Sequence, residues 1–199
     1  WLTLLPCGRS AALNRQEGWP QGENPFIDLL HPCFLGPLPR EENDGLLTTL
    51  GRRARLQFAP EALAEVYAET GGHPSLSRAL GSQILSAGKG KVTAARVQAA
   101  VTGFLKNRDQ TAILRAMYEG RMDQDEQEIA RTLALQGPQP KTALFPPSAD
   151  VARRRQIRSA LENLVDTTVL IEKADGRVAH RYGLLRRVVQ QEAEELGYA

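Results

Sequence analysis

From Arg40 onward, apolar residues recur at the period of an α-helix, and prolines, glycines and N-capping residues separate one periodic segment from the next. Four such segments fill residues 40–106, and they start at Arg40, Pro60, Pro74 and Thr93. The first has acidic residues in its first turn and arginines in its last, as the helix macrodipole favours. The pattern predicts four short helices packed as a small bundle, and therefore a mainly α fold.

After residue 106 the pattern changes to three more helices, a β-hairpin and a final helix. The helices are expected near residues 109–119 and 125–135 and from Asp150, with Ile113 and Leu114 among the inward residues of the first. Asp175-Gly176 is a strong signal for the hairpin turn. This order is that of a winged-helix domain. The connecting residues 136–150 contain four prolines, and we expect a mobile or functional loop there.

The first 39 residues are different in character from the rest. "WLTLLPCGRS" is an apolar run closed by turn residues, typical of the last part of a central parallel strand that has no sheet of its own to join. We therefore expect three parts: residues 1–39, the end of a larger α/β domain; residues 40–106, the helical bundle; and residues 107–199, the winged helix. We also expect a fragment whose beginning lies elsewhere.

Composition narrows the class of protein. Apolar residues make up 42% of the sequence, but no apolar run is long enough to span a membrane. We expect a cytoplasmic protein. Cys7 and Cys33 lack a CxxC partner, so we expect free thiols, and three histidines offer no spacing suited to zinc. The net charge is +2, and residues 107–199 carry equal numbers of basic and acidic residues, 14 of each. Global charge therefore does not draw this part towards nucleic acid.

In this order the segments resemble the C-terminal part of a P-loop ATPase of the AAA+ and STAND (signal-transduction ATPases with numerous domains) kind. "LTLLPCGRS" resembles the sensor-1 strand, "CFLGPLPREENDGLL" the connection into the helical lid, and "TGGHP" the Gly-x-Pro motif of the lid. The segment 157–189 resembles the winged helix that follows the lid in bacterial and archaeal members. The resemblance implies a remnant of an α/β P-loop domain, a four-helix lid bundle and a winged-helix domain with a β-hairpin.

The resemblance also implies a nucleotide site. In similar ATPases the Gly-x-Pro turn covers the adenine, so Gly72, His73 and Pro74 would contact the base of ATP or ADP. Glycine permits close approach to a flat ring, and proline offers a rigid apolar face. Arg9 and Ser10 lie where a sensor would contact the γ-phosphate. The alternatives are a plain helix corner at the turn and ordinary polar residues at a strand end.

His180 is the remaining nucleotide candidate. Similar switches carry a histidine just before the last winged-helix helix, where it reaches the β-phosphate. In "VAHRYGLLRR" Tyr182 is nearer to that place, and alternation along the strand puts His180 on the same face as Val178. A structural histidine is therefore the alternative. Because the sequence contains neither GxxxxGK[ST] nor paired acids after an apolar strand, we expect Mg²⁺ to be bound outside this segment, which cannot hydrolyse ATP alone.

Two functions follow. The first is a nucleotide-dependent switch, in which lid and winged helix close over ADP or ATP and control an effector domain or an assembly. Its partners would be the rest of the ATPase core, the effector domains and further copies of the parent protein. The second is a DNA-binding winged helix of an origin-binding or regulator-type AAA+ ATPase. The arginines expected on the DNA face, or on a protein-binding face, are Arg153, Arg154, Arg155, Arg158, Arg177 and Arg181.

Overall fold

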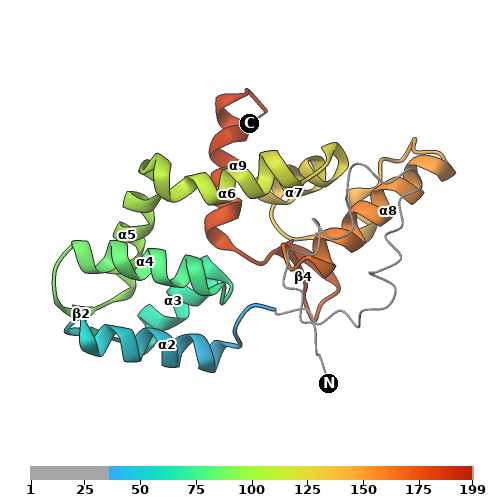
Figure 1. Cartoon of the computed structure of the whole chain (residues 1–199). Coiled ribbons are helices and arrows are strands. Elements are labelled where there is room, and N and C mark those ends of the chain that lie inside the picture. Colours follow the sequence, from blue (N-terminus) through green and yellow to red (C-terminus); the bar gives the residue numbers. More distant parts are fainter. Residues whose placement is uncertain (1–35, 199) are drawn as a thin grey trace, which may run out of the picture. The chain divides into compact units, whose positions relative to one another are not determined.

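The computed structural model describes residues 36–198, and these residues are mainly helical, as the periodicity predicts (Figure 1). Residues 37–199 form one compact unit. The predicted sensor-1 strand lies outside the described residues. Among residues 36–198, every helix is too short or too polar to cross a membrane.

The four helices expected between residues 40 and 106 are all present. They are α2 (Arg40–Arg53), α3 (Pro60–Thr70), α4 (Pro74–Ser86) and α5 (Ala94–Lys106). The Thr93 side chain accepts a hydrogen bond from the backbone N–H of Arg96, which confirms the predicted cap of α5. Their shared core includes Val66, Leu80 and Phe104, none of which is exposed to solvent.

Two strands in this part are not evident from the sequence. β1 (Leu56–Phe58) and β2 (Gly90–Val92) pair in parallel, with Leu56 opposite Gly90. Each has only three residues, too few for an alternating pattern to stand out. The pair joins the end of α2 to the residues before α5.

The second half follows the predicted order. Its helices are α6 (Arg108–Arg121), α7 (Gln124–Gln136), α8 (Val151–Asp166) and α9 (Gly183–Glu195). The hairpin consists of β4 (Leu170–Glu172) and β5 (Arg177–His180). Asp150 caps α8 by accepting a hydrogen bond from the Arg153 backbone N–H at 2.7 Å.

The segment 136–150, expected to be a loop, is partly ordered into secondary structure. β3 (Gln139–Pro140) pairs antiparallel with β5, so that the sheet order is β3-β5-β4, and a 3₁₀ turn, η1 (Lys141–Leu144), follows. Pro140 is compatible with this pairing because β3 is an edge strand. A second difference concerns α6, where Leu114 is buried but Ile113 is exposed.

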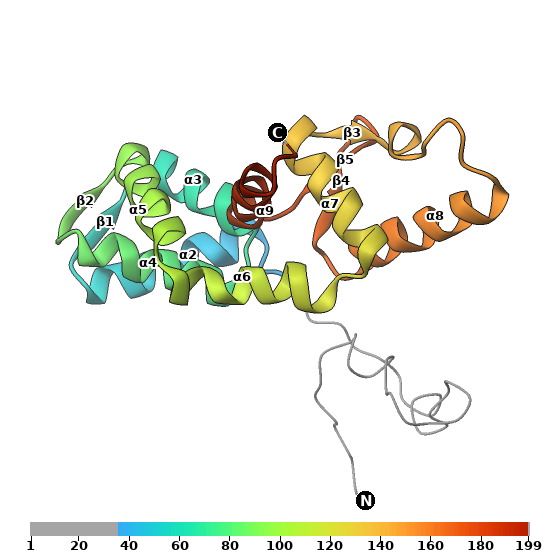
Figure 2. The same cartoon turned by 90° about the horizontal axis from the view of Figure 1, so that it is seen from above.

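The last helix connects the two halves. α9 contacts α3 and α5 on one side and α6 and α7 on the other, and Figure 2 shows it between these groups. Asn107 is at once the residue that ends α5 and the N-cap of α6, so the two helices follow one another directly. A division into independent domains at residues 106 and 107 stays a prediction.

Candidate functional site

The turn 71–74 begins where α3 stops. Gly71 has the left-handed conformation (φ 56°) that commonly ends a helix, and its N–H donates to the Tyr67 carbonyl. Gly72 also has a positive φ, of 78°. Pro74 then begins α4, where its fixed φ fits the first helical position and its missing N–H is no loss. The sequence therefore forms a sharp corner between two helices.

Gly72 has a close neighbour of its own. The Leu38 N–H donates to the Gly72 carbonyl at 2.9 Å, and a Cβ added to Gly72 would lie only 2.2 Å from the Leu38 carbonyl oxygen. The need for glycine at this position is thus explained by the chain entering α2. This explanation differs from the sequence argument, in which the glycine made room for a ligand.

The turn also meets the residues that precede α9. A Cβ on Gly71 would lie 2.7 Å from side-chain atoms of both Arg181 and Tyr182. The rings of His73 and Tyr182 pack edge to face, with centroids 5.8 Å apart and planes at 82°. The Tyr182 hydroxyl is hydrogen-bonded to Thr168 at 2.9 Å. The structure therefore brings the turn 71–74 against Arg181 and Tyr182, which follow β5.

His73 supplies the imidazole of this corner. Its ring is partly buried, and burial lowers the pKa of the imidazole below its ordinary value. Its Nδ1 is buried and has no hydrogen-bond partner among the described residues. The imidazole is therefore mainly neutral at pH 7. Pro74, next to it, is exposed.

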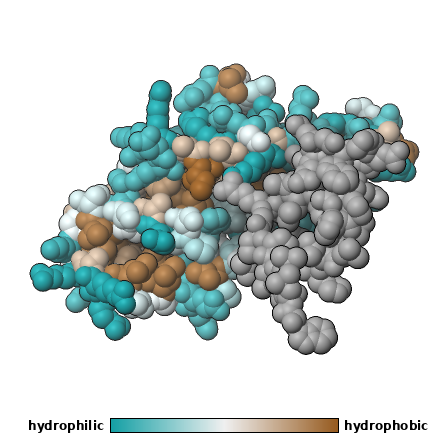
Figure 3. Space-filling model, viewed as in Figure 1, coloured by the Kyte–Doolittle hydropathy of each residue, from teal (hydrophilic) through white to brown (hydrophobic). Residues whose placement is uncertain are grey.

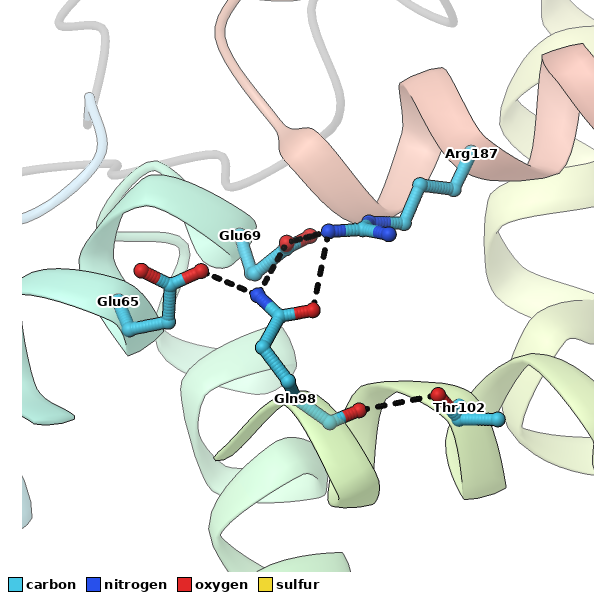
Figure 4. Close-up of polar contacts among 5 residues, drawn as sticks. All are labelled: Glu65, Glu69, Gln98, Thr102 and Arg187. Atoms are coloured by element: carbon cyan, nitrogen blue, oxygen red, sulfur yellow. Dashed lines mark hydrogen bonds and ion pairs between the residues drawn. The ribbon is translucent and has the colours of Figure 1, made fainter. Parts of the chain in front are cut away.

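A polar network, which sequence reasoning missed, ties α9 to the helix that ends at this turn (Figure 4). Glu69 is in the last turn of α3, with a side chain only 5% exposed, and it accepts three hydrogen bonds from Arg187 of α9, the shortest at 2.6 Å. Arg187 also donates to Gln98 of α5 at 3.2 Å, and Gln98 donates to Glu65. A bidentate pair of this kind, with a buried carboxylate, holds α3 and α9 in a defined register.

No sequence signal short of the fold would have found this pair. Its members are 118 residues apart, and Glu69 reads as an ordinary helix-end acid. Comparison with protein-family models and with curated proteins found no match for this chain. The candidate site is therefore supported by the contacts described above and not by similarity to a known protein.

His180 is placed elsewhere. Its Nε2 lies 2.8 Å from the Ala130 carbonyl oxygen of α7, and since a carbonyl only accepts, Nε2 carries the proton. Burial lowers the pKa of His180 to about 4. Tyr182, rather than His180, packs against the turn, and the contact with α7 favours the structural interpretation of His180. Arg9 and Ser10 lie outside the described residues.

The six arginines expected on one face are not equivalent. Arg153 is paired with Asp125 and Glu128 of α7, at 2.5 and 3.4 Å, and Arg177 is near Asp175, at 3.7 Å. Arg181 packs its stem at the corner beside Gly71. The remaining three are exposed on α8: Arg154, Arg155 and Arg158.

Within residues 36–198, no cluster of three or more His, Cys, Asp or Glu side chains is arranged to hold a metal ion. A cavity of about 40 Å³ lies between α7, η1 and α8, lined by Asp125, Thr132, Leu144 and Arg153 among others. That volume suits water and is far too small for a nucleotide.

Proposed function

We propose that this chain is the lid and winged-helix part of a STAND- or AAA+-like ATPase and that it acts as a nucleotide-dependent conformational switch. The observation that carries the proposal is the contact between the turn 71–74 and Arg181-Tyr182. The turn is the segment for which the family resemblance implies contact with the base, and Arg181-Tyr182 directly follows His180, the residue implied to reach the phosphate. The two segments are more than 100 residues apart in the sequence. A lid turn and a winged helix that meet at one point can respond together to one ligand.

In this proposal the turn recognises the base and not the phosphates. Pro74 offers an exposed apolar ring, and it lies next to the partly buried, neutral imidazole of His73. An adenine ring is flat, so it can stack on the exposed proline ring. The phosphates and Mg²⁺ would bind to a P-loop core outside residues 1–199, because no phosphate-binding loop motif occurs in this sequence.

The switch itself would be a change at the same corner. ADP or ATP bound over the turn would alter how closely Tyr182 and Arg181 pack on it, and so the position of α9. A ligand shifts such an equilibrium only by its differential affinity for the two arrangements. Effector domains and further copies of the protein would be the parts that respond.

The test is Pro74→Ala in the full-length natural protein, followed by calorimetric titration with ADP. Alanine removes the apolar ring but suits the first turn of a helix, so we expect affinity to fall about tenfold with little change in melting temperature. Pro60→Ala is the matched control, since Pro60 is also exposed and also begins a helix, α3. Equal ADP affinity in the two variants and the natural protein would leave the turn as a helix corner and overturn the proposal.

The alternative function, a DNA-binding winged helix, is supported by Arg154, Arg155 and Arg158 on the exposed side of α8. Half of the predicted arginine face is used otherwise, however, because Arg153, Arg177 and Arg181 have partners or packing within the chain. Arg154 also donates a hydrogen bond to the Ala149 carbonyl at 3.0 Å, and the three exposed arginines share α8 with Glu162 and Asp166. We therefore keep the nucleotide switch as the proposed function.

A further inference from the structure

The basic residues of the bundle are distributed very unevenly. Residues 45–60 and 70–108 contain no Asp or Glu, so that between residues 45 and 108 every acid belongs to α3. The same two stretches contain nine basic residues. Because these stretches contain no acidic residues, their Lys and Arg side chains have no acidic partner nearby in the sequence. The electrostatic potential that they produce therefore depends on where the fold places them.

The parallel pairing of β1 and β2 places five of them together. Arg52 and Arg53 end α2, Arg55 precedes β1, and Lys89 and Lys91 flank Gly90 at the start of β2. Gly90 donates its N–H to the Arg55 carbonyl at 2.9 Å, which fixes the two segments side by side. We call these five residues the bundle-end basic surface. All five are exposed, and within the described part of the chain none has an ion-pair partner.

A sixth cation holds the loop of this surface in shape. The Arg96 guanidinium donates to the carbonyls of Lys89 at 3.3 Å and Lys91 at 3.1 Å, and also to those of Ile84 and Gly88. The negative ends of four peptide dipoles are thus turned towards Arg96. These hydrogen bonds hold the loop that carries Lys89 and Lys91 in one conformation. The partial negative charges of its carbonyl oxygens are balanced by Arg96, and so they do not offset the charges of the two lysines.

We infer that the bundle-end basic surface binds the phosphate backbone of a nucleic acid duplex. Five unpaired cations on one fixed surface can each neutralise a phosphate, and three of them are arginines, whose planar guanidinium matches phosphate geometry. Hydrophilic residues project from the end of the molecule where β2 lies, beside a band of hydrophobic residues (Figure 3). Glu61 is the acid nearest to β1 in the sequence, but it follows the C-terminal end of the strand, whereas Arg55 precedes the N-terminal end.

The surface suits a duplex better than a membrane. Its exposed apolar neighbours are Leu50 and Leu85, which are only 39% and 38% exposed and so do not project as inserting side chains do. The interaction would be independent of base sequence, since contacts to phosphate oxygens carry no sequence information. This inference does not rest on the proposed nucleotide switch, because α2, β1 and β2 take no part in the turn 71–74.

The experiment uses the full 199-residue chain and a fluorescent 20-base-pair duplex of arbitrary sequence, with affinity measured by anisotropy between 25 and 200 mM salt. For about five phosphate contacts we expect log K to fall with log salt at a slope of roughly −4 to −5. Lys89→Gln with Lys91→Gln should reduce the slope by about 2 and weaken binding at low salt at least tenfold. Both positions are exposed, and the melting temperature should be unchanged.

The matched control is Arg154→Gln with Arg155→Gln, which removes two exposed cations from α8 and should leave the slope as it is. A slope that falls with this pair and not with the lysine pair would overturn the inference and assign DNA binding to α8. No duplex binding at 25 mM salt would also overturn it. So would tighter binding to vesicles containing 30% phosphatidylserine than to the duplex, since the surface would then be a membrane contact.

Discussion

Gly183 begins α9 at a point where a side chain has no room. A Cβ there would lie 2.6 Å from a carboxylate oxygen of Glu69 and 2.9 Å from the Ala68 carbonyl oxygen. Gly183→Ala should therefore destabilise the fold by about 1–3 kcal/mol, because α9 must shift away from α3. Gly45→Ala is the control: Gly45 lies within α2 with nothing within 4 Å of its Cβ position, and alanine should stabilise by about 0.5–1 kcal/mol. Denaturant unfolding of both variants measures the difference; a neutral Gly183→Ala would contradict the close packing.

His180 predicts a pH dependence of stability. Its pKa is lowered from 6.5 to about 4 in the folded protein, so between these values the unfolded chain binds more protons. The stabilisation from the neutral imidazole is fully present above pH 6.5 and is lost progressively as the pH falls towards 4, by roughly 3 kcal/mol. Thermal melting from pH 8 to pH 4 should show this loss. In His180→Gln the slope between pH 6.5 and 4 should be clearly smaller; an identical slope would assign the loss to other groups.

Single residues could be predicted where their role is local. Pro74 at a helix start and Thr93 and Asp150 as caps follow from preferences that depend on one or two neighbours. The role of Glu69 cannot be predicted from the sequence, because its partner Arg187 is distant in sequence. Each residue on its own is equally compatible with an exposed position on a helix. Tyr182 is close to His180 in the sequence, but only the fold shows that Tyr182 is the residue that meets the turn.

At the scale of elements, the Glu69–Arg187 pair couples α3 to α9. Arg187→Ala would leave a nearly buried carboxylate without its partner, and we expect a loss of about 3 kcal/mol. Arg187→Lys keeps the charge without the bidentate geometry and should lose less. A double-mutant cycle with Glu69→Gln, followed by urea unfolding, gives the coupling between the two side chains. A coupling energy near zero would mean that the pair is formed but contributes nothing.

The helices were predictable as elements and the small strands were not. All eight expected helices between Arg40 and Glu195 are present because their apolar period extends over three turns or more. β1, β2 and β3 have three residues or fewer, and they form because tertiary packing brings their backbones together. Their pairing creates the bundle-end basic surface, which the sequence alone therefore does not reveal.

At the scale of the whole molecule, part of the segment 136–150 is held by pairing with the sheet. This restricts the residues at which we expect a protease to cut first. Gln139 and Pro140 are paired with β5, and Lys141 forms an ion pair with Glu172 at 2.7 Å. The residues 145–150 that follow have no such pairing and connect η1 to α8. We expect subtilisin to cut first within 145–150, before any cut at Asn107. First cleavage at Asn107, detected by mass spectrometry, would show instead that the two halves separate readily.

The parallel arrangement of β1 and β2 has a consequence for the order of folding. Parallel strands cannot be joined by a tight turn, and here the whole of α3 and α4 lies between Leu56 and Gly90. Helices form from local contacts. Pairing of β1 with β2, in contrast, closes a loop of more than 30 residues and carries the entropy cost of that closure, so we expect this two-stranded ribbon to form later. Val92→Ala should accordingly speed unfolding far more than it slows refolding, as stopped-flow kinetics can measure, because the ribbon forms after the transition state.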